Sequence, residues 1–423
     1  MIVMEKKIFA LVITAMMLGS LVVLNGYTPV VQAPIQLGEV KIGVITAVPD
    51  LTDLAKYQIL LGQLAANDIN KNLKMKGVTA QFTFDIRAGS YPDRDAIFTS
   101  VQELHNQGTD LIIGGFYSGQ AMHSLAFVHA NNMLMISPMS TSPSLEIAND
   151  GLYRMCPSDS FVTIALADML VSSQIDSIII LERFDHMNYQ VDMGFAAVNK
   201  VPVISTIGYD GFGDPTLMDA EYDRVLQMAE NDARTAINAG KKVAIVLLAY
   251  GEVNLIKKIP NYSTLYNLNW FDGNNYGPSN SAQALQESAK IHLYRPVQTI
   301  PPETLTRFNA LQERYRAIAG NDKFLNWYDA ATYDIAWVIA ESVLTAKSKD
   351  TSNVIEVLPQ VSSNYAGVSG VCKLNASGDR ANPYYEIVGY YVKDPSTNPP
   401  IVDSKTYGYC DYNAKRFVWY TLP

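Results

Sequence analysis

The chain has 423 residues, of which 48% are hydrophobic and 17% charged, and its 32 basic and 41 acidic side chains give a net charge of −9. This composition excludes a disordered chain, and the length exceeds one ordinary core, so two lobes are expected. Since no block of Lys and Arg occurs, the sequence also argues against a nucleic-acid partner.

The N-terminus has the layout of a secretory signal. Lys6 and Lys7 precede the uncharged residues 8–24, and small and polar residues follow as far as Ala33. Residues 1–33 are therefore predicted to be a signal peptide or an N-terminal membrane anchor. The apolar run spans roughly 25 Å, just short of a comfortable membrane crossing, which leaves both alternatives open. Either one predicts an exported protein, periplasmic or at the cell surface.

Apolar strands alternate with segments of helical periodicity along most of the chain. In chain order we expect strand 40–45, helix 57–65, strand 80–86, helix 97–104, strand 110–115, a helix from Gly119, strand 132–137, helix 160–172, strand 177–181, helix 188–199, strand 201–206, a helix within 218–239, strand 242–249, helices 303–319 and 328–346, and strands 385–392 and 415–420. Repeated strand–helix–strand units predict mostly parallel sheets covered by helices.

The series of strands and helices restarts near residue 157, which predicts a second lobe of similar build. Gly- and Ser-rich stretches at 276–281 and 362–370 are expected to carry the chain back between the lobes. Lobe 1 is therefore predicted to contain residues 38–157 and about 279–362. Lobe 2 is predicted to contain about 158–278 and about 363–423. The predicted fold class is α/β, with two similar lobes joined by a multi-crossing hinge.

Three cysteines, at positions 156, 372 and 410, are too few for a disulfide scaffold. Export permits one bridge, and we expect Cys372 to pair with Cys410 because both lie in the C-terminal segment. Cys156 is then expected to be a small buried residue. Since the chain has no Cys-x-x-Cys motif, a zinc or redox site is not expected.

The sequence shows no catalytic constellation. His-Glu-x-x-His, a P-loop and Gly-x-Ser-x-Gly are absent, and the five histidines do not form a ligand cluster. The sequence therefore predicts no enzyme, no metal and no cofactor.

Hydroxyl groups follow two successive apolar strands. Ser118 comes after the run 111–113, and Ser140 and Thr141 come after 133–136. Ligands of open α/β sheets bind at the carboxyl ends of the strands, where helix N-termini present N–H groups that suit a carboxylate. The alternative is that these side chains only cap the helices that follow.

Five stretches, taken in order, resemble the extracytoplasmic solute-binding proteins of branched-chain amino-acid ABC transporters, which have the type I periplasmic-binding fold. They are VKIGVITAVPD with LAANDINKN, DLIIGGFYSGQA followed by MLMISPMSTSPSL, YRMCPSD, WYDAATYDIAWVIAESVLTA, and YAGVSGVCKLNASGD. The likeness extends over nearly all of residues 40–393. It implies a protein that captures a small solute, an amino acid or related compound, in an interlobe cleft and delivers it to an ABC permease. The alternative is a membrane-tethered ligand-sensing receptor domain of the same fold.

The resemblance also implies roles for individual residues. Ser118 and Thr141 would bind the α-carboxylate of an amino acid, helped by the backbone near Met139. Asp159 falls on a cleft position at the lobe crossing, and Asp272 is the candidate partner of the α-ammonium. The remaining implied ligand-site residues are Tyr117 and Ser140 in the first lobe and an aromatic of the second lobe, Tyr189 or Phe184.

Overall fold

The computed structural model describes residues 35–47, 53–87, 89, 93–184, 193–210, 215–249, 253–273, 282–398 and 400–421. The predicted signal or anchor segment and Tyr189 lie outside these residues. Among the helices that the structure describes, none has both the length and the apolar character of a membrane span.

The first sheet contains five parallel strands in the order β2–β1–β3–β4–β5. They are β1 (Gln36–Ile45), β2 (Thr79–Arg87), β3 (Leu111–Ile113), β4 (Leu134–Ser137) and β5 (Leu152–Arg154). Helices α2 (Asp53–Met75), α10 (Leu305–Ala319), α11 (Trp327–Ala346) and α12 (Thr351–Asn364) cover one face, and α3 (Arg94–Asn106) and α4 (Ser118–Ala130) cover the other. Such double coverage explains why the central strands are continuously apolar.

The second sheet contains eight strands in the order β13–β12–β11–β10–β9–β8–β6–β7. The parallel strands are β6 (Ser177–Phe184), β7 (Val203–Asp210), β8 (Val243–Leu248), β9 (Asn269–Asp272) and β10 (Leu293–Gln298), and the antiparallel ones are β11 (Tyr384–Asp394), β12 (Ile401–Asp411) and β13 (Arg416–Trp419). Helix α5 (Ser160–Ser172) covers one face, and α7 (Pro215–Asn238), α8 (Val253–Lys258) and α9 (Ala282–Lys290) cover the other. The short 3-10 helices are η1 (Pro143–Leu145), η2 (Ile259–Asn261), η3 (Leu265–Asn267) and η4 (Pro302–Thr304).

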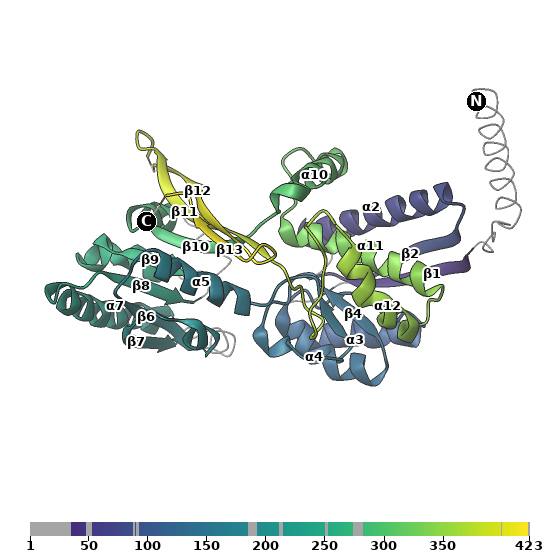
Figure 1. Cartoon of the computed structure of the whole chain (residues 1–423), viewed down its shortest axis with the longest axis horizontal. Helices are drawn as coiled ribbons and strands as arrows, with labels where there is room; N and C mark the ends of the chain where they lie inside the picture. Colours follow the sequence, from purple (N-terminus) through teal and green to yellow (C-terminus); the bar gives the residue numbers. More distant parts are fainter. Residues whose placement is uncertain are drawn as a thin grey trace, which may run out of the picture.

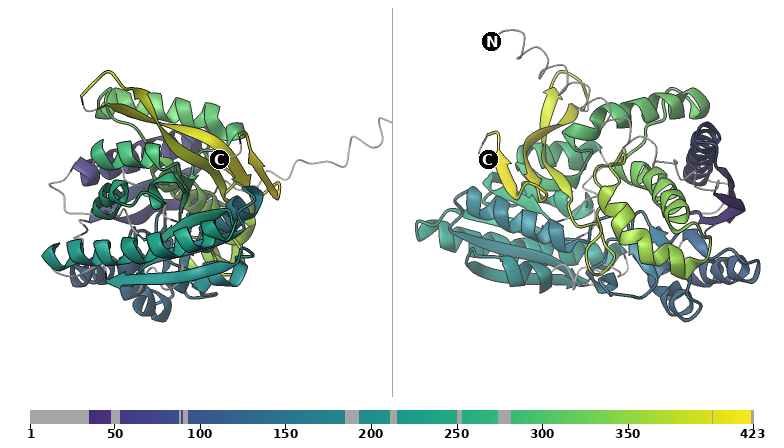
Figure 2. Two further views of the ribbon diagram at one scale, coloured as in Figure 1. Left: turned by 90° about the vertical axis from the view of Figure 1, so that its left-hand side faces the viewer. Right: turned by 45° about the vertical axis from the view of Figure 1, so that its right-hand side comes forward.

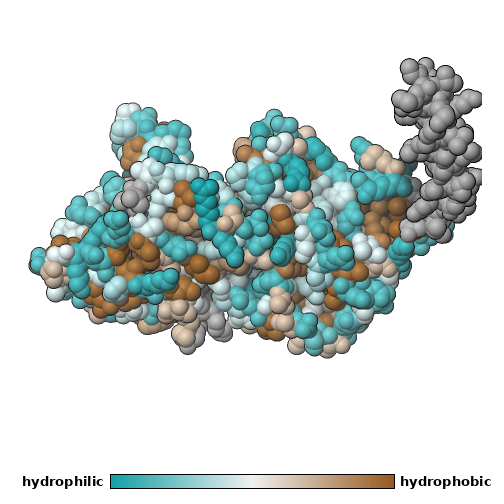
Figure 3. Space-filling model, in the orientation of Figure 1, coloured by the Kyte–Doolittle hydropathy of each residue, from teal (hydrophilic) through white to brown (hydrophobic). Residues whose placement is uncertain are grey.

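The two sheets belong to two lobes that lie side by side, with the β11–β12 hairpin rising from their junction along the second lobe (Figures 1 and 2). This arrangement confirms the predicted α/β class with mostly parallel sheets flanked by helices. On the face drawn in Figure 3, hydrophobic residues lie in separate groups among hydrophilic ones, as on the surface of most globular proteins.

Within the described residues, the chain passes between the lobes three times, at 155–159, 299–301 and 381–383. These crossings differ from the predicted boundaries. Helix α9 and strand β10 belong to the second lobe, whereas residues 365–374 pack in the core of the first lobe. The Gly- and Ser-rich stretch 362–370 contains the end of α12 and the loop after it, held by a bond from Trp327 Nε1 to the Ser369 carbonyl (3.1 Å). Such a composition marks a turn without indicating to which lobe the turn belongs.

The predicted disulfide is wrong, because all three cysteines are free. Cys156 and Cys372 are buried in the core of the first lobe, and Cys410 is buried in the core of the second. The last crossing separates the two C-terminal cysteines, a change of lobe that their positions in the sequence did not reveal. Burial raises the pKa of the Cys156 and Cys372 thiols to about 12, so both are neutral at physiological pH.

Thiol titration should therefore count three reactive cysteines in denaturant without reductant, and almost none within minutes in the native protein. The physical reason is that the thiolate is the reacting form, and burial both disfavours it and blocks access. A denatured chain that shows one thiol, and gains two more only on reduction, would contradict this assignment.

Candidate functional site

The carboxyl ends of β3, β4 and β5 lie next to one another, at the edge of the first sheet from which the chain crosses to the second lobe. Ser118 begins α4 just after β3, and Ser140 and Thr141 follow β4. Asp159 follows β5 and directly precedes α5. The structure therefore brings these four predicted site residues to one edge.

The loop after β4 is held to the loop after β3 through the carbonyl group of Gly115. The Ser137 hydroxyl donates to this carbonyl (2.7 Å), and the Ser140 hydroxyl donates to it as well. Gly115 has a φ of +67°, and a Cβ there would lie 3.0 Å from the Ala121 Cβ, so glycine suits the position. The fully buried Ser140 thus fixes the loop after β4 to Gly115 by donating its hydroxyl hydrogen.

Ser118 is buried and joins the start of α4 to the loop after β4. Its Oγ accepts a bond from the backbone N–H of Ser142 (3.2 Å). The N-cap of α4 is Tyr117, whose backbone N–H donates to the Gln120 Oε1 (3.2 Å). Ser118 is therefore not the helix cap that the alternative interpretation required, and its hydroxyl lies between the two loops.

Thr141 and Asp159 are linked twice. The Thr141 Oγ1 donates to the Asp159 Oδ2 (2.9 Å), and the Asp159 backbone N–H donates to the Thr141 carbonyl (2.8 Å). Burial raises the pKa of the Asp159 carboxyl to about 7, although the bond from Thr141 and the charge of Arg154 both act in the opposite direction. Asp159 is consequently a carboxyl group that changes its charge near neutral pH.

Arg154 lies beneath these loops and was not among the predicted site residues. Its fully buried guanidinium donates from Nη1 to the carbonyls of Ser140 (2.8 Å) and Ser142 (2.7 Å), and from Nε to the Asp379 Oδ1 (2.5 Å). A charged residue in an otherwise apolar strand signals a buried partner, since an unpaired buried charge is costly. The sequence offers no pattern that identifies Asp379 as this partner.

A second buried network lies next to the first. Asp334 of α11 accepts bonds from the backbone N–H groups of Val368 and Ser369 (2.8 Å each) and from the Ser369 hydroxyl (2.5 Å). Arg380 donates to the Ser369 hydroxyl (2.9 Å) and carbonyl (3.0 Å), and its guanidinium lies over the Trp327 ring. This network braces the loop after α12 from within the first lobe.

Of the predicted second-lobe residues, Asp272 and Phe184 lie in described strands of the second sheet. Asp272 is buried at the end of β9. Burial raises the pKa of Tyr390, and the nearby Asp272 acts in the same direction. Phe184 ends β6 with 60% of its side chain exposed.

The first-lobe cluster consists of Ser118, Ser140, Thr141 and Asp159. Tyr117 and Met139, which directly precede Ser118 and Ser140 in the chain, are larger and half-buried. The Met139 backbone N–H, which we expected to help bind a carboxylate, donates to the Ser137 Oγ (3.2 Å).

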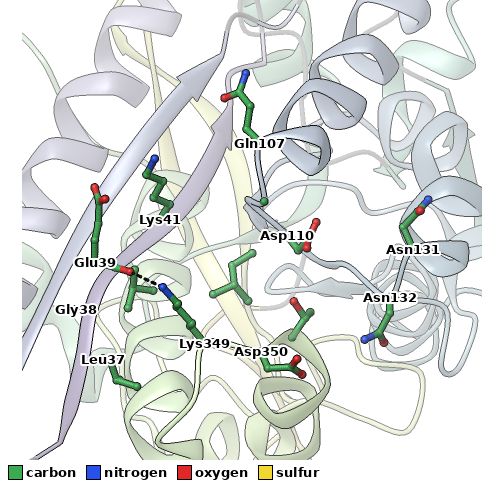
Figure 4. Close-up of a pocket in the computed structure, with 14 residues that line it drawn as sticks. Leu37, Gly38, Glu39, Lys41, Gln107, Asp110, Asn131, Asn132, Lys349 and Asp350 are labelled. Atoms are coloured by element: carbon green, nitrogen blue, oxygen red, sulfur yellow. Dashed lines mark hydrogen bonds between the residues drawn. The ribbon is translucent and has the colours of Figure 1, made fainter.

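A separate pocket of about 500 Å³ lies at the opposite, amino-terminal edge of the first sheet (Figure 4). It is lined by the start of β1, the loop before β3 and the start of α12, and Lys349 Nζ bonds the Glu39 carbonyl across it (3.3 Å). None of the predicted site residues lines this pocket, so it is distinct from the first-lobe cluster.

Residues 63–392 match the family described as the receptor family ligand binding region. The chain belongs to this family. The matched region includes both the first-lobe cluster and Asp272, so every predicted site residue lies within the part of the chain that the family defines. A protein of uncharacterized function from Methanocaldococcus jannaschii is 24% identical over 354 residues, which cover 77% of this chain and 80% of that protein.

Solved structures of this fold include two transport proteins with bound amino acids. An ABC transporter substrate-binding protein from Desulfitobacterium hafniense, in complex with Leu, has a TM-score of 0.63 at 18% identity, covering 90% of this chain and 99% of that one. The branched-chain amino acid substrate-binding protein LivJ from Streptococcus pneumoniae, in complex with isoleucine, has a TM-score of 0.60 at 16% identity, covering 82% and 95%. These likenesses confirm the type I periplasmic-binding fold predicted from the sequence.

Proposed function

We propose that the protein captures a small solute, an amino acid or related compound, between its two lobes, outside the cytoplasm, and delivers it to an ABC permease. Membership of a ligand-binding family supports the capture of a ligand. Two proteins of the same fold hold Leu and isoleucine, which supports an amino acid as the class of ligand.

The first lobe offers groups for both ends of a zwitterion. The start of α4, with its partial positive charge, and the hydroxyl of Ser118 suit a carboxylate. The Asp159 carboxyl, steadied by Thr141, suits an ammonium group. The observation that carries the proposal is this 2.9 Å Thr141–Asp159 bond beside Ser118, at the carboxyl ends of adjacent parallel strands.

The second lobe would complete the site when the two lobes close. Asp272 and Phe184 each end a strand of the second sheet, where Asp272 would add a second acidic group and Phe184 or Tyr189 an apolar cover. Three crossings of the described chain form a hinge about which the lobes can rotate. Closure would remove water and strengthen the polar contacts to the ligand.

Calorimetric titration of the full chain at pH 8 with the twenty common amino acids tests this function. We expect saturable binding of one or a few of them, and an approximately tenfold loss of affinity for Ser118→Ala, because a hydrogen bond to the ligand carboxylate is removed. The matched control is Lys349→Ala, in the pocket at the far edge of the sheet, which should bind normally. If no amino acid binds, the zwitterion proposal is wrong.

The family description also supports a second candidate, a receptor domain of the same fold that senses the same ligand. The two candidates share the site and differ in the membrane partner. Co-purification of a permease would support transport, and co-purification of a transmembrane signalling protein would support the receptor.

A further inference from the structure

The guanidinium of Arg154 determines the orientation of one peptide unit in the ligand loop, defined here as residues 138–142. Its Nη1 binds the Ser140 carbonyl (2.8 Å), so this carbonyl points toward Arg154. In a planar trans peptide the C=O of one residue and the N–H of the next point in opposite directions. The backbone N–H of Thr141 therefore points away from Arg154. Arg154 thus fixes the direction of the Thr141 N–H, a hydrogen-bond donor. Thr141 is also the residue whose hydroxyl binds Asp159.

The same side chain also connects the ligand loop to the last crossing between the lobes. Its Nε binds Asp379 (2.5 Å), while the backbone of Arg154 donates to the Gly378 carbonyl (2.9 Å) and accepts from the Arg380 N–H (3.0 Å). The crossing to β11 begins directly after Arg380. A movement of the ligand loop is therefore transmitted through one side chain to the segment that carries the chain into the second lobe.

The ion pair is not arranged for the greatest stability. Among the described residues, Arg154 Nη2 and Asp379 Oδ2 are buried without a hydrogen-bond partner. Replacing a buried ion pair by apolar side chains of similar volume is often neutral or stabilising. Apolar side chains could replace the Arg154–Asp379 pair without loss of stability. A role in fixing the backbone of the ligand loop explains why the pair is present.

We propose that Arg154 is a positioning residue: it contacts no ligand itself, holds the ligand loop in its binding geometry, and with Asp379 couples ligand occupancy to the crossing before β11. The coupling to a ligand rests on the proposed function. The geometry of the ligand loop can be measured without any ligand.

The test compares Arg154→Met, the double variant Arg154→Met/Asp379→Leu, and the control Ser369→Ala. The control removes bonds to Asp334 and Arg380 in the neighbouring network and leaves the ligand loop untouched. Hydrogen exchange at the Ser140 and Ser142 amides, which are bonded to the hydroxyls of Ser137 (3.0 Å) and Ser118 (3.2 Å), thermal unfolding, and calorimetry with L-leucine and L-isoleucine are the measurements.

We expect the double variant to recover the stability that the single variant loses, because no unpaired charge stays buried. In both Arg154 variants, however, the Ser140 and Ser142 amides should exchange at least about tenfold faster. Affinity for the amino acid should also fall at least about tenfold, since the carbonyl contacts are not restored. The Ser369→Ala control should retain wild-type exchange at Ser140 and Ser142 and wild-type affinity.

Recovery of slow exchange and affinity together with stability in the double variant would overturn the positioning role. If Arg154→Met does not fold, the double variant provides the same comparison with the wild type. If neither amino acid binds the wild type, the proposed function fails for these ligands, while the exchange rates at Ser140 and Ser142 still decide whether Arg154 orders the ligand loop.

Discussion

Asp159→Asn should weaken the binding of a zwitterionic amino acid by about 30- to 100-fold at pH 8, because a neutral amide replaces the charged partner of the ammonium group. The substitution preserves the shape of the side chain and an oxygen that can accept the bond from Thr141. The fold should therefore be retained. Calorimetry with the amino acid that binds most tightly to the wild type provides the measurement.

The pH dependence of ligand affinity in the wild type tests the same role of Asp159. Burial raises the pKa of Asp159 to about 7, so about a tenth of the molecules carry the negative charge at pH 6. Affinity should fall about tenfold from pH 8 to pH 6 in the wild type and stay nearly constant in Asp159→Asn. The stability of the ligand-free protein changes in the opposite direction. The folded state holds this proton more tightly than the unfolded state does, so this carboxyl lowers the free energy of unfolding as pH rises from about 4 to about 7.

The matched control is Asp168→Asn, which removes another carboxyl whose pKa burial raises, on α5 in the second lobe. This variant should keep both the affinity and its pH dependence. An equal loss of affinity in the two variants, or an unchanged pH dependence in Asp159→Asn, would contradict the role of Asp159.

Asp334→Ala should lower the free energy of unfolding by about 3–5 kcal/mol. Asp334 is fully buried and accepts three bonds from Val368 and Ser369. Burial raises the pKa of its carboxyl, while these bonds and the charge of Arg380 act in the opposite direction. Its removal leaves two backbone N–H groups and a buried guanidinium without their acceptor or counter-charge. Urea unfolding followed by circular dichroism measures the change.

The exposed N-cap of α12 gives the control for this prediction. Asp350 accepts a bond from the Ser352 N–H (3.0 Å) and is exposed to solvent. Asp350→Ala should cost only about 1 kcal/mol. A loss at Asp334 no larger than that at Asp350 would show that the buried network does not hold the loop after α12.

The sequence predicted the fold, and the position of three first-lobe residues at one edge of the sheet, because both depend on local patterns. Alternation of apolar strands and amphipathic helices indicates parallel sheets, and parallel strands bring their carboxyl ends together. Ser118, Thr141 and Asp159 follow such strands and lie at one edge of the sheet, as expected.

The errors concern pairs of residues that are distant in sequence. Arg154 and Asp379 are 225 positions apart, so no spacing relates them. The disulfide prediction failed for a similar reason, since proximity in sequence between Cys372 and Cys410 did not reveal the crossing between them. In the proposed function the second lobe completes the site by rotating against the first, and a local sequence pattern does not encode such a movement.

A crystal structure of the full chain in complex with its tightest-binding amino acid is the most direct test of the proposed site. The account predicts a ligand carboxylate about 3 Å from the Ser118 hydroxyl and the Thr141 amide, and an ammonium group about 3 Å from the Asp159 carboxylate. A ligand bound elsewhere, such as in the pocket between β1 and α12, with the first-lobe loops unoccupied, would contradict it.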